Sequence, residues 1–369
     1  MGLITGSNLA NASEVIDTIR TTLVAEGWTL ERSTGSTGAD SLEIFLSLPA
    51  VDTFNGNGML VGLKSQNSGN ELRVTMSHLT AAAANVTGSP QNTFSRVLGT
   101  PGFNYTAGAT GSGNPVGNSG DTYEGVVLTA NSDNNGGTSN GWGTGANYLR
   151  HWIFTPNSSP FGSTEVYCYA VVEVETGVFR TIAFGEGIKL GGGSWDGGLF
   201  FTGTYIDTGQ AERSERTFYG DYQRTIFDDN EQGGFILNFN NPQIQSASPA
   251  VWCPWVAMGY PSQNGASAIG MGNSAMGLDF IGKSPSPFSG QAIRVPSRFY
   301  QMNVIEGAGP PRLRPLIECP DVFLTNIVDL TPGDVVLDDV ERFLVVPASA
   351  KTGATSTGNA GFLIRNSLL

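Results

Sequence analysis

Few residues of this chain have the types and spacing that acid–base or nucleophilic chemistry requires. The sequence contains only two histidines, His78 and His151, and histidine is the side chain best suited to act as a base near neutral pH. His78 ends one expected strand and His151 begins another, and no Gly-x-Ser-x-Gly nucleophile turn accompanies them. We therefore expect both histidines to be ordinary sheet residues, and we assign no catalytic residue.

Paired carboxylates are the second chemical candidate, because glycan hydrolysis needs two acidic groups across a cleft. The sequence offers Glu173 with Glu175 on one strand, Asp228 with Asp229 in a loop, and Asp338 with Asp339 in a turn. Any acidic chain contains such pairs, so we interpret them as solvated surface. The loop from Asp228 to Glu231 lacks the alternating ligands of a calcium loop. No metal and no cofactor is expected.

The cysteines also indicate structure rather than chemistry. Cys168, Cys253 and Cys319 lie far apart, form no Cys-x-x-Cys pair and are odd in number, which argues against a disulfide framework. We expect free thiols that act as small core side chains.

Aromatic residues in glycine-rich surroundings are the remaining site candidates. They are Trp142, Trp195, Trp252 and Trp255. Tryptophans in loops are common at protein interfaces and carbohydrate sites. These four are predicted to contact either a neighbouring subunit or a glycan, or else to be buried.

Composition limits the functions further. Lys and Arg number 19 against 32 Asp and Glu, a net charge of −13, and only 14% of residues are charged. An acidic surface repels phosphate, so sequence-specific nucleic-acid binding is not expected. Low charge suits a surface covered by neighbours in an assembly, since Lys and Glu are depleted at interfaces. No signal peptide and no membrane span is expected.

The elements that would position these residues are mainly strands. Glycine accounts for 50 of 369 residues, which is typical of a β protein with many tight turns. One amphipathic helix is predicted over 12–26, with Asn11 as N-cap and Gly27 as C-cap. Strands are predicted over 41–48, 59–64 and 72–76, with a turn at 67–70.

The predicted fold is mainly β, with sandwich- or barrel-like domains and a small N-terminal α+β domain. The α+β domain covers 1–85, and 86–147 forms a Gly-, Asn- and Ser-rich loop or insertion that contains a short strand near Tyr123–Leu128. A main β domain follows over 148–300, with strands at 148–154, 165–175, 178–184, 199–206 and 234–239. A C-terminal β segment, 301–369, contains a type II turn at Thr331–Asp334 and a hairpin over 335–346. We expect the polar stretches 86–147 and 263–277 to be ordered mainly by partners.

Three short blocks resemble structural proteins of tailed bacteriophages. The first runs from Tyr167 to Lys189 and continues into Trp195-Asp-Gly-Gly-Leu-Phe200; the second is Gly27-Trp28-Thr29 after the helix. The third joins Leu330-Thr-Pro-Gly-Asp334 to Arg342-Phe-Leu-Val-Val-Pro347. The blocks agree in order across most of the chain, and none of them is a catalytic signature.

The resemblance implies a non-enzymatic virion component, made in the bacterial host cytoplasm, in the neck, collar, head–tail connector, tail or baseplate. Its expected partners are copies of itself, in a ring or another symmetric oligomer, and other virion proteins. Two alternatives remain: a receptor- or glycan-binding protein at the particle tip, and a virion-associated polysaccharide hydrolase.

Overall fold

The fold is mainly β, as the sequence predicts. The computed structural model describes residues 2–36, 42–48, 58–66, 71–79, 125–130, 147–156, 166–190, 199–203, 234–237, 254–256, 294–303, 312–338, 340–347 and 360–369. Most of these residues lie in strands, and a single 14-residue helix accounts for a small share of them. The strands form three sheets in which all of the pairs are antiparallel.

A central sheet separates two outer sheets. Its strands lie in the order β1 (Leu3–Gly6), β7 (Arg150–Phe154), β8 (Tyr167–Glu175), β9 (Val178–Glu186), β11 (Leu199–Gly203) and β12 (Gly234–Leu237). Almost every residue of β8 and β9 is buried, because both faces of these strands are covered. A sheet covered on both faces is built from near-continuous apolar runs rather than from strict alternation. This accounts for the long β-branched and aromatic stretch over 165–184.

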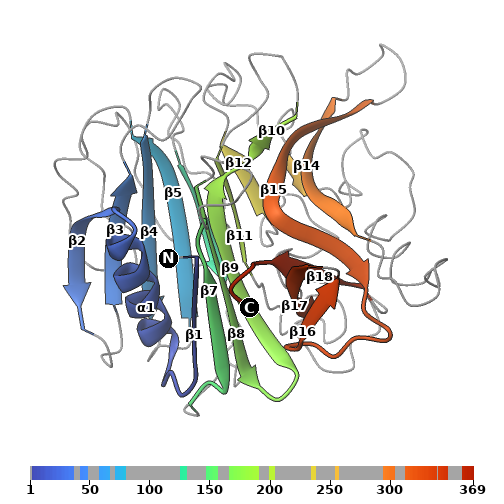
Figure 1. The fold of residues 1–369 in the computed structure, drawn as a ribbon. Helices are drawn as coiled ribbons and strands as arrows, with labels where there is room; N and C mark the ends of the chain where they lie inside the picture. The colour runs from blue at the N-terminus through green and yellow to red at the C-terminus, as the bar shows by residue number, and fades with distance from the viewer. Residues whose placement is uncertain are drawn as a thin grey trace, which may run out of the picture.

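The N-terminal sheet covers one face of the central sheet, together with the described helix. Its strand order is β2 (Thr29–Gly35), β3 (Leu42–Leu48), β4 (Gly58–Gln66), β5 (Glu71–Leu79) and β6 (Gly125–Ala130). The helix α1 (Ala12–Ala25) lies along this sheet (Figure 1). One apolar cluster joins Ile16 of α1 and Val61 of β4 to Val172 of β8. Leu9 bridges Tyr148 in the register of the β1–β7 ladder, so the chain stays beside the central sheet until just before α1.

Both ends of α1 carry the caps that the sequence predicts. The Asn11 side chain accepts hydrogen bonds from the Ser13 and Glu14 amides, at 2.9 and 3.2 Å. Gly27 has φ +95°, and the Trp28 amide donates to the Leu23 carbonyl at 2.9 Å, the arrangement of a Schellman cap. Sequence signals alone therefore fix where this helix begins and ends.

Removing the N-cap gives a first prediction. Asn11→Ala deprives two helix amides of their acceptor and should lower the free energy of unfolding by about 1 kcal/mol. Asn11→Asp keeps an acceptor oxygen and should leave stability nearly unchanged. Urea unfolding followed by circular dichroism measures both variants, and equal losses in the two would contradict the capping role.

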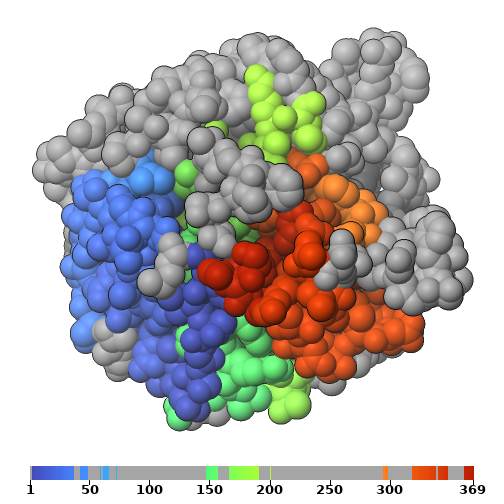
Figure 2. Space-filling view, in the orientation of Figure 1, coloured from blue at the N-terminus to red at the C-terminus, as the bar shows by residue number. Residues whose placement is uncertain are grey.

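The C-terminal sheet covers the opposite face of the central sheet. Its order is β13 (Pro254–Val256), β14 (Val295–Asn303), β15 (Arg312–Asn326), β18 (Ala360–Arg365), β17 (Glu341–Pro347) and β16 (Val335–Asp338); β10 (Ile188–Lys189) also pairs with β15. A second apolar cluster joins Tyr169 and Phe179 of the central sheet to Leu344 and Phe362. Figure 2 shows the outer sheets on either side of the molecule, with central-sheet residues surfacing between them at the bottom.

The two ends of the chain lie beside each other. The Asn366 side chain donates to the Gly2 carbonyl at 2.7 Å, and the Thr155 amide donates to the same oxygen at 3.2 Å. Both ends lie near the middle of the view in Figure 1. The first and last segments are thereby tied to one another and to the central sheet.

Several predicted elements are confirmed and others were missed. The predicted strands over 41–48, 59–64 and 72–76 appear as β3, β4 and β5, and the hairpin over 335–346 appears as β16 and β17. The type II turn is confirmed by Gly333, whose φ is +85°. The strands β1, β2, β14 and β15 were not predicted. The turn at 67–70 and the stretch 263–277 lie outside the described residues, and the domain boundaries stay predictions.

Candidate functional site

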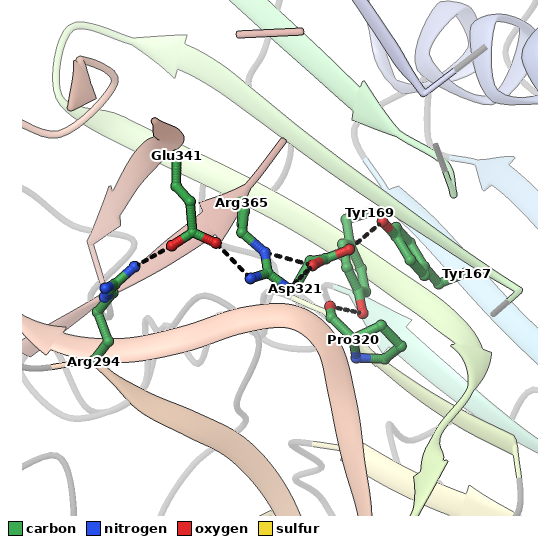
Figure 3. A network of polar contacts seen from close by, with 7 residues as sticks. All are labelled: Tyr167, Tyr169, Arg294, Pro320, Asp321, Glu341 and Arg365. Atoms are coloured by element: carbon green, nitrogen blue, oxygen red, sulfur yellow. Dashed lines mark hydrogen bonds and ion pairs between the residues drawn. The ribbon is translucent and has the colours of Figure 1, made fainter. Parts of the chain in front are cut away.

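The C-terminal sheet is fastened to the central sheet by a polar joint centred on Asp321. Its carboxylate accepts from the Tyr167 hydroxyl at 2.8 Å and from Arg365 Nε at 2.8 Å. The neighbouring Pro320 carbonyl accepts from the buried Tyr169 hydroxyl at 2.7 Å. Figure 3 shows both tyrosines of β8 reaching this corner from the central sheet. Side-chain contacts from two strands, β8 and β18, therefore converge on a single bend of β15.

The backbone at this bend is unusual. Asp321 has φ +58°, a left-handed conformation that Asp and Asn adopt more readily than other non-glycine residues. Pro296 of β14 lies opposite Phe323 of β15, but Arg298, two residues on, lies opposite Glu318. The residues of β15 between these two pairs therefore form a bulge. The bulge turns the Asp321 carboxylate toward Tyr167 and Arg365, away from the ladder.

The joint extends outward into a chain of ion pairs. Arg365 also contacts Glu341 at 2.7 Å, and Glu341 contacts Arg294 at 2.6 Å. Burial acts to raise the pKa of the Glu341 carboxyl, but the hydrogen bonds from Arg365 and Arg294 outweigh it and lower that pKa. Each guanidinium also lies over a ring, Arg365 over Phe323 and Arg294 over Phe343. The network links β15, β17 and β18 to the residue just before β14 (Figure 3).

A second joint fixes the turn that leads into β16. Arg150 of β7 pairs with the buried carboxylate of Glu173 at 2.5 Å and donates to the Gly333 carbonyl at 3.1 Å. A Cβ at Gly333 would lie 2.3 Å from Arg150 Nη2 and 3.1 Å from Phe179 Cζ. The turn therefore packs directly onto the central sheet, and β16 starts from a fixed position.

The strand that follows, β16, carries exposed apolar side chains. Val335 is 46% exposed and Leu337 69%, and Val340 at the hairpin tip is 83% exposed. Leu337 and Val340 are the most exposed large apolar side chains among the described residues. Soluble proteins expose single apolar residues routinely, but a group of them on one edge marks a contact site. We define Val335, Leu337 and Val340 as the hairpin edge.

In the described part of the chain, the backbone of β16 is paired on one side only. It is the last strand of the C-terminal sheet and, within the described residues, pairs only with β17. The Val345 amide donates to the Asp334 carbonyl at 3.0 Å. Because hydrogen-bonded and non-hydrogen-bonded pairs alternate in an antiparallel ladder, the amide and carbonyl groups of Val335 and Leu337 point away from β17. An open, apolar edge strand of this kind is a template for pairing with another chain.

The residues considered for catalysis lie elsewhere. The prediction that both glutamates are solvated is wrong for Glu173, which is buried at 4% exposure and bound to Arg150. Glu175 is exposed, as predicted, beyond a bulge of the same strand. Cys168 and Cys319 are buried free thiols whose pKa values are raised by burial, so both are core side chains as predicted.

The described residues contain no cluster of His, Cys, Asp and Glu that could hold a metal ion. Among them there is also no helix of sufficient length and apolarity to cross a membrane.

His151 is buried against the N-terminal strand. His151 is 6% exposed, and its buried Nδ1 atom has no hydrogen-bond partner. Gly6 lies opposite in register, and a Cβ there would lie 2.5 Å from the imidazole Cε1. Burial lowers the pKa of His151 from its ordinary value of 6.5. The imidazole therefore acts as a neutral packing group under strand β1.

This burial predicts a loss of stability in mild acid. The unfolded chain takes up a proton near pH 6.5, whereas the folded chain resists it until a lower pH. Stability should therefore be complete above pH 6.5 and fall as the pH drops through the folded pKa, by at most about 1.4 kcal/mol per pH unit. Urea unfolding at a series of pH values tests this. His151→Gln should flatten the dependence near pH 6, and an unchanged dependence in this variant would contradict the assignment to His151.

The predicted tryptophan sites fall mostly outside the described structure. Trp142, Trp195 and Trp252 lie beyond the described residues. Trp255 is placed by its backbone in β13, opposite Tyr300 of β14. Their roles as interface or glycan contacts stay predictions. The other two tryptophans, Trp28 and Trp152, are core residues at 6% and 7% exposure.

The hairpin edge was missed by sequence reasoning, although its signal was present. Val335 and Leu337 occur in a short alternating run, and such a run predicts a strand with one buried face. Only the sheet order shows that this strand is an edge whose apolar side chains are uncovered.

Comparison of the chain with protein-family models and with curated proteins finds no match.

Proposed function

We propose that this chain is a structural subunit of a tailed-bacteriophage particle, assembling with copies of itself and with neighbouring virion proteins in the neck, collar, tail or baseplate. The observation that carries the proposal is the hairpin edge. A strand that exposes both apolar side chains and unpaired backbone groups is costly for a monomer to keep. In an assembly the same strand is covered.

The arrangement of the resembling blocks supports this proposal. The block from Tyr167 to Lys189 forms β8, β9 and β10, and the block from Leu330 to Pro347 forms the turn and hairpin that pack against them. The blocks thus build the contact between two sheets and supply one partner in each polar joint, Tyr167 and Gly333. Their chemistry is that of a rigid scaffold that presents an edge in a fixed position.

The proposal is tested on purified particles and on the isolated chain. We expect mass spectrometry of density-banded virions to recover this chain in constant stoichiometry. Replacing Leu337 and Val340 with serine should leave the fold intact, because both side chains are exposed, but should reduce incorporation into particles severalfold. Serine at Val24, an apolar residue 43% exposed on α1, is the matched control. Absence of the chain from banded virions would overturn the proposal.

A further inference from the structure

We propose that the open side of β16 accepts an added antiparallel strand from a partner protein, a segment with apolar residues at alternate positions and Lys or Arg at both ends. This inference rests on the proposed function and names the partner of the hairpin edge. Strand addition obtains affinity from backbone hydrogen bonds and specificity from alternate side chains. The hairpin edge offers both the backbone groups and the alternate apolar side chains that strand addition requires.

The backbone of the edge has the pairing groups in place. The amide and carbonyl groups of Val335 and Leu337 point away from β17, as the Asp334–Val345 hydrogen bond requires. On the other side of the hairpin, the Asn366 amide donates to the Arg342 carbonyl at 3.0 Å. That bond places the backbone of Arg342, the partner of Leu337, toward β18 and so confirms the alternation independently. An incoming strand would meet two complete sets of donors and acceptors.

The side chains of the edge continue a buried apolar layer. Val335 lies opposite Leu344, and cross-strand neighbours share a face of the sheet. Leu344 belongs to the core between the central and C-terminal sheets. Val335 and Leu337 carry this face outward to solvent, where they are 46% and 69% exposed. An added strand with apolar residues on the same face would extend the core by one strand.

Charge decides which strand fits. The sequence places Asp334 just before β16 and Asp338 at its end. If a second copy of β16 paired antiparallel, each end would bring an aspartate of one chain toward an aspartate of the other, and like charges in such pairs are destabilising. Arg342 is the basic residue beside Leu337, and its guanidinium is directed to the carbonyl of Leu369. A partner strand with basic ends is therefore favoured over a second copy.

The test uses the full chain and fluorescently labelled synthetic peptides. One peptide carries valine at alternate positions with lysine at both ends, and its matched control carries glutamate at both ends. Fluorescence anisotropy measures binding of each. We expect the lysine peptide to bind roughly tenfold more tightly, since each end gains an opposite charge instead of a like one. Asp334→Lys should reduce or invert this preference.

A proline variant separates strand addition from other contacts. Leu337→Pro removes an amide that points outward and leaves the β17 hydrogen bonds in place, which is where proline is tolerated in sheets. Binding of the lysine peptide should fall at least tenfold, with an unchanged circular dichroism spectrum. If that spectrum changes, a lysine peptide with N-methylated valines supplies the same test on the unaltered chain, because it cannot donate to the edge.

The outcomes distinguish this inference from the proposed function. Equal binding of the two peptides, or binding unaffected by both the Leu337→Pro change and N-methylation, overturns the added strand. So does a dimer in sedimentation that Leu337→Pro dissociates, because it would identify a second copy as the occupant. Either result can stand beside recovery of the chain from virions, in which case the proposed function survives without this inference.

Discussion

Gly185→Ala is expected to prevent stable folding of the central sheet. Gly185 lies in β9 opposite Tyr167 of β8. A Cβ there would lie 2.3 Å from the Val166 carbonyl oxygen and 2.6 Å from Tyr167 Cα. These are backbone atoms, so no side-chain rotation can relieve the clash, and the two strands would have to separate. We expect a loss of about 3 kcal/mol or more in the free energy of unfolding.

The matched control is Gly27→Ala at the end of α1. Gly27 has φ +95° but no atom within 4 Å of the added Cβ, so its cost comes only from the left-handed backbone and should be about 1 kcal/mol. Thermal and urea unfolding of both variants measures the difference. Similar losses at the two positions would contradict the packing argument for Gly185.

The second large effect is expected at Asp321. Asp321→Ala removes the acceptor of the Tyr167 hydroxyl and the partner of Arg365, and it places alanine at φ +58°. The ion pair is partly exposed and therefore screened by solvent. The left-handed alanine and the loss of the hydrogen bond between Tyr167 and Asp321 should together cost about 2 to 3 kcal/mol. Urea unfolding provides the measurement.

Two variants separate the contributions at this position. Asp321→Asn keeps a residue that tolerates the left-handed backbone and loses only the charge, so it should cost about 1 kcal/mol. Tyr167→Phe removes the hydrogen bond to Asp321 and keeps the ring, and it should cost a similar amount. If Asp321→Asn were as damaging as Asp321→Ala, the charge alone would account for the joint and the backbone argument would be wrong.

The joints matter for function because they fix the hairpin edge in space. Arg150 holds the turn before β16, and the Asp321 network holds β17 and β18 through Arg365 and Glu341. An edge that accepts another strand loses less freedom on binding when it is already rigid. Variants of Asp321 that still fold should therefore bind a partner strand less tightly.

Local sequence signals determined the elements that depend on near neighbours. The caps of α1 follow from Asn11 and Gly27, and the turn at Thr331–Asp334 follows from Pro332 and Gly333. The β8–β9 hairpin follows from two apolar runs around Gly177, whose φ is +76°. Each of these features is settled by contacts within a few residues, which is why pattern and propensity predict them.

Two of the strands that were missed, β14 and β15, contain prolines that interrupt the pattern. Pro296 lies in β14, and Pro315 and Pro320 lie in β15. Proline normally argues against an internal strand because it cannot donate to the ladder. In the β14–β15 ladder, the register shifts between Pro296 and Arg298, and the residues of β15 skipped by this shift include Pro320. The ladder is therefore already interrupted at both prolines. A bulge that depends on a distant partner strand has no local signature.

The sequence by itself determined that this chain is a mainly β protein with one short capped helix near its start, because turn residues and apolar periodicity act over a few positions. Only the tertiary structure decided which strands lie side by side, that Asp321 meets Tyr167 and Arg365 from separate strands, and that β16 is an edge. Those features depend on contacts between residues far apart in the chain, and the energy of such contacts cannot be read from any one segment of the sequence.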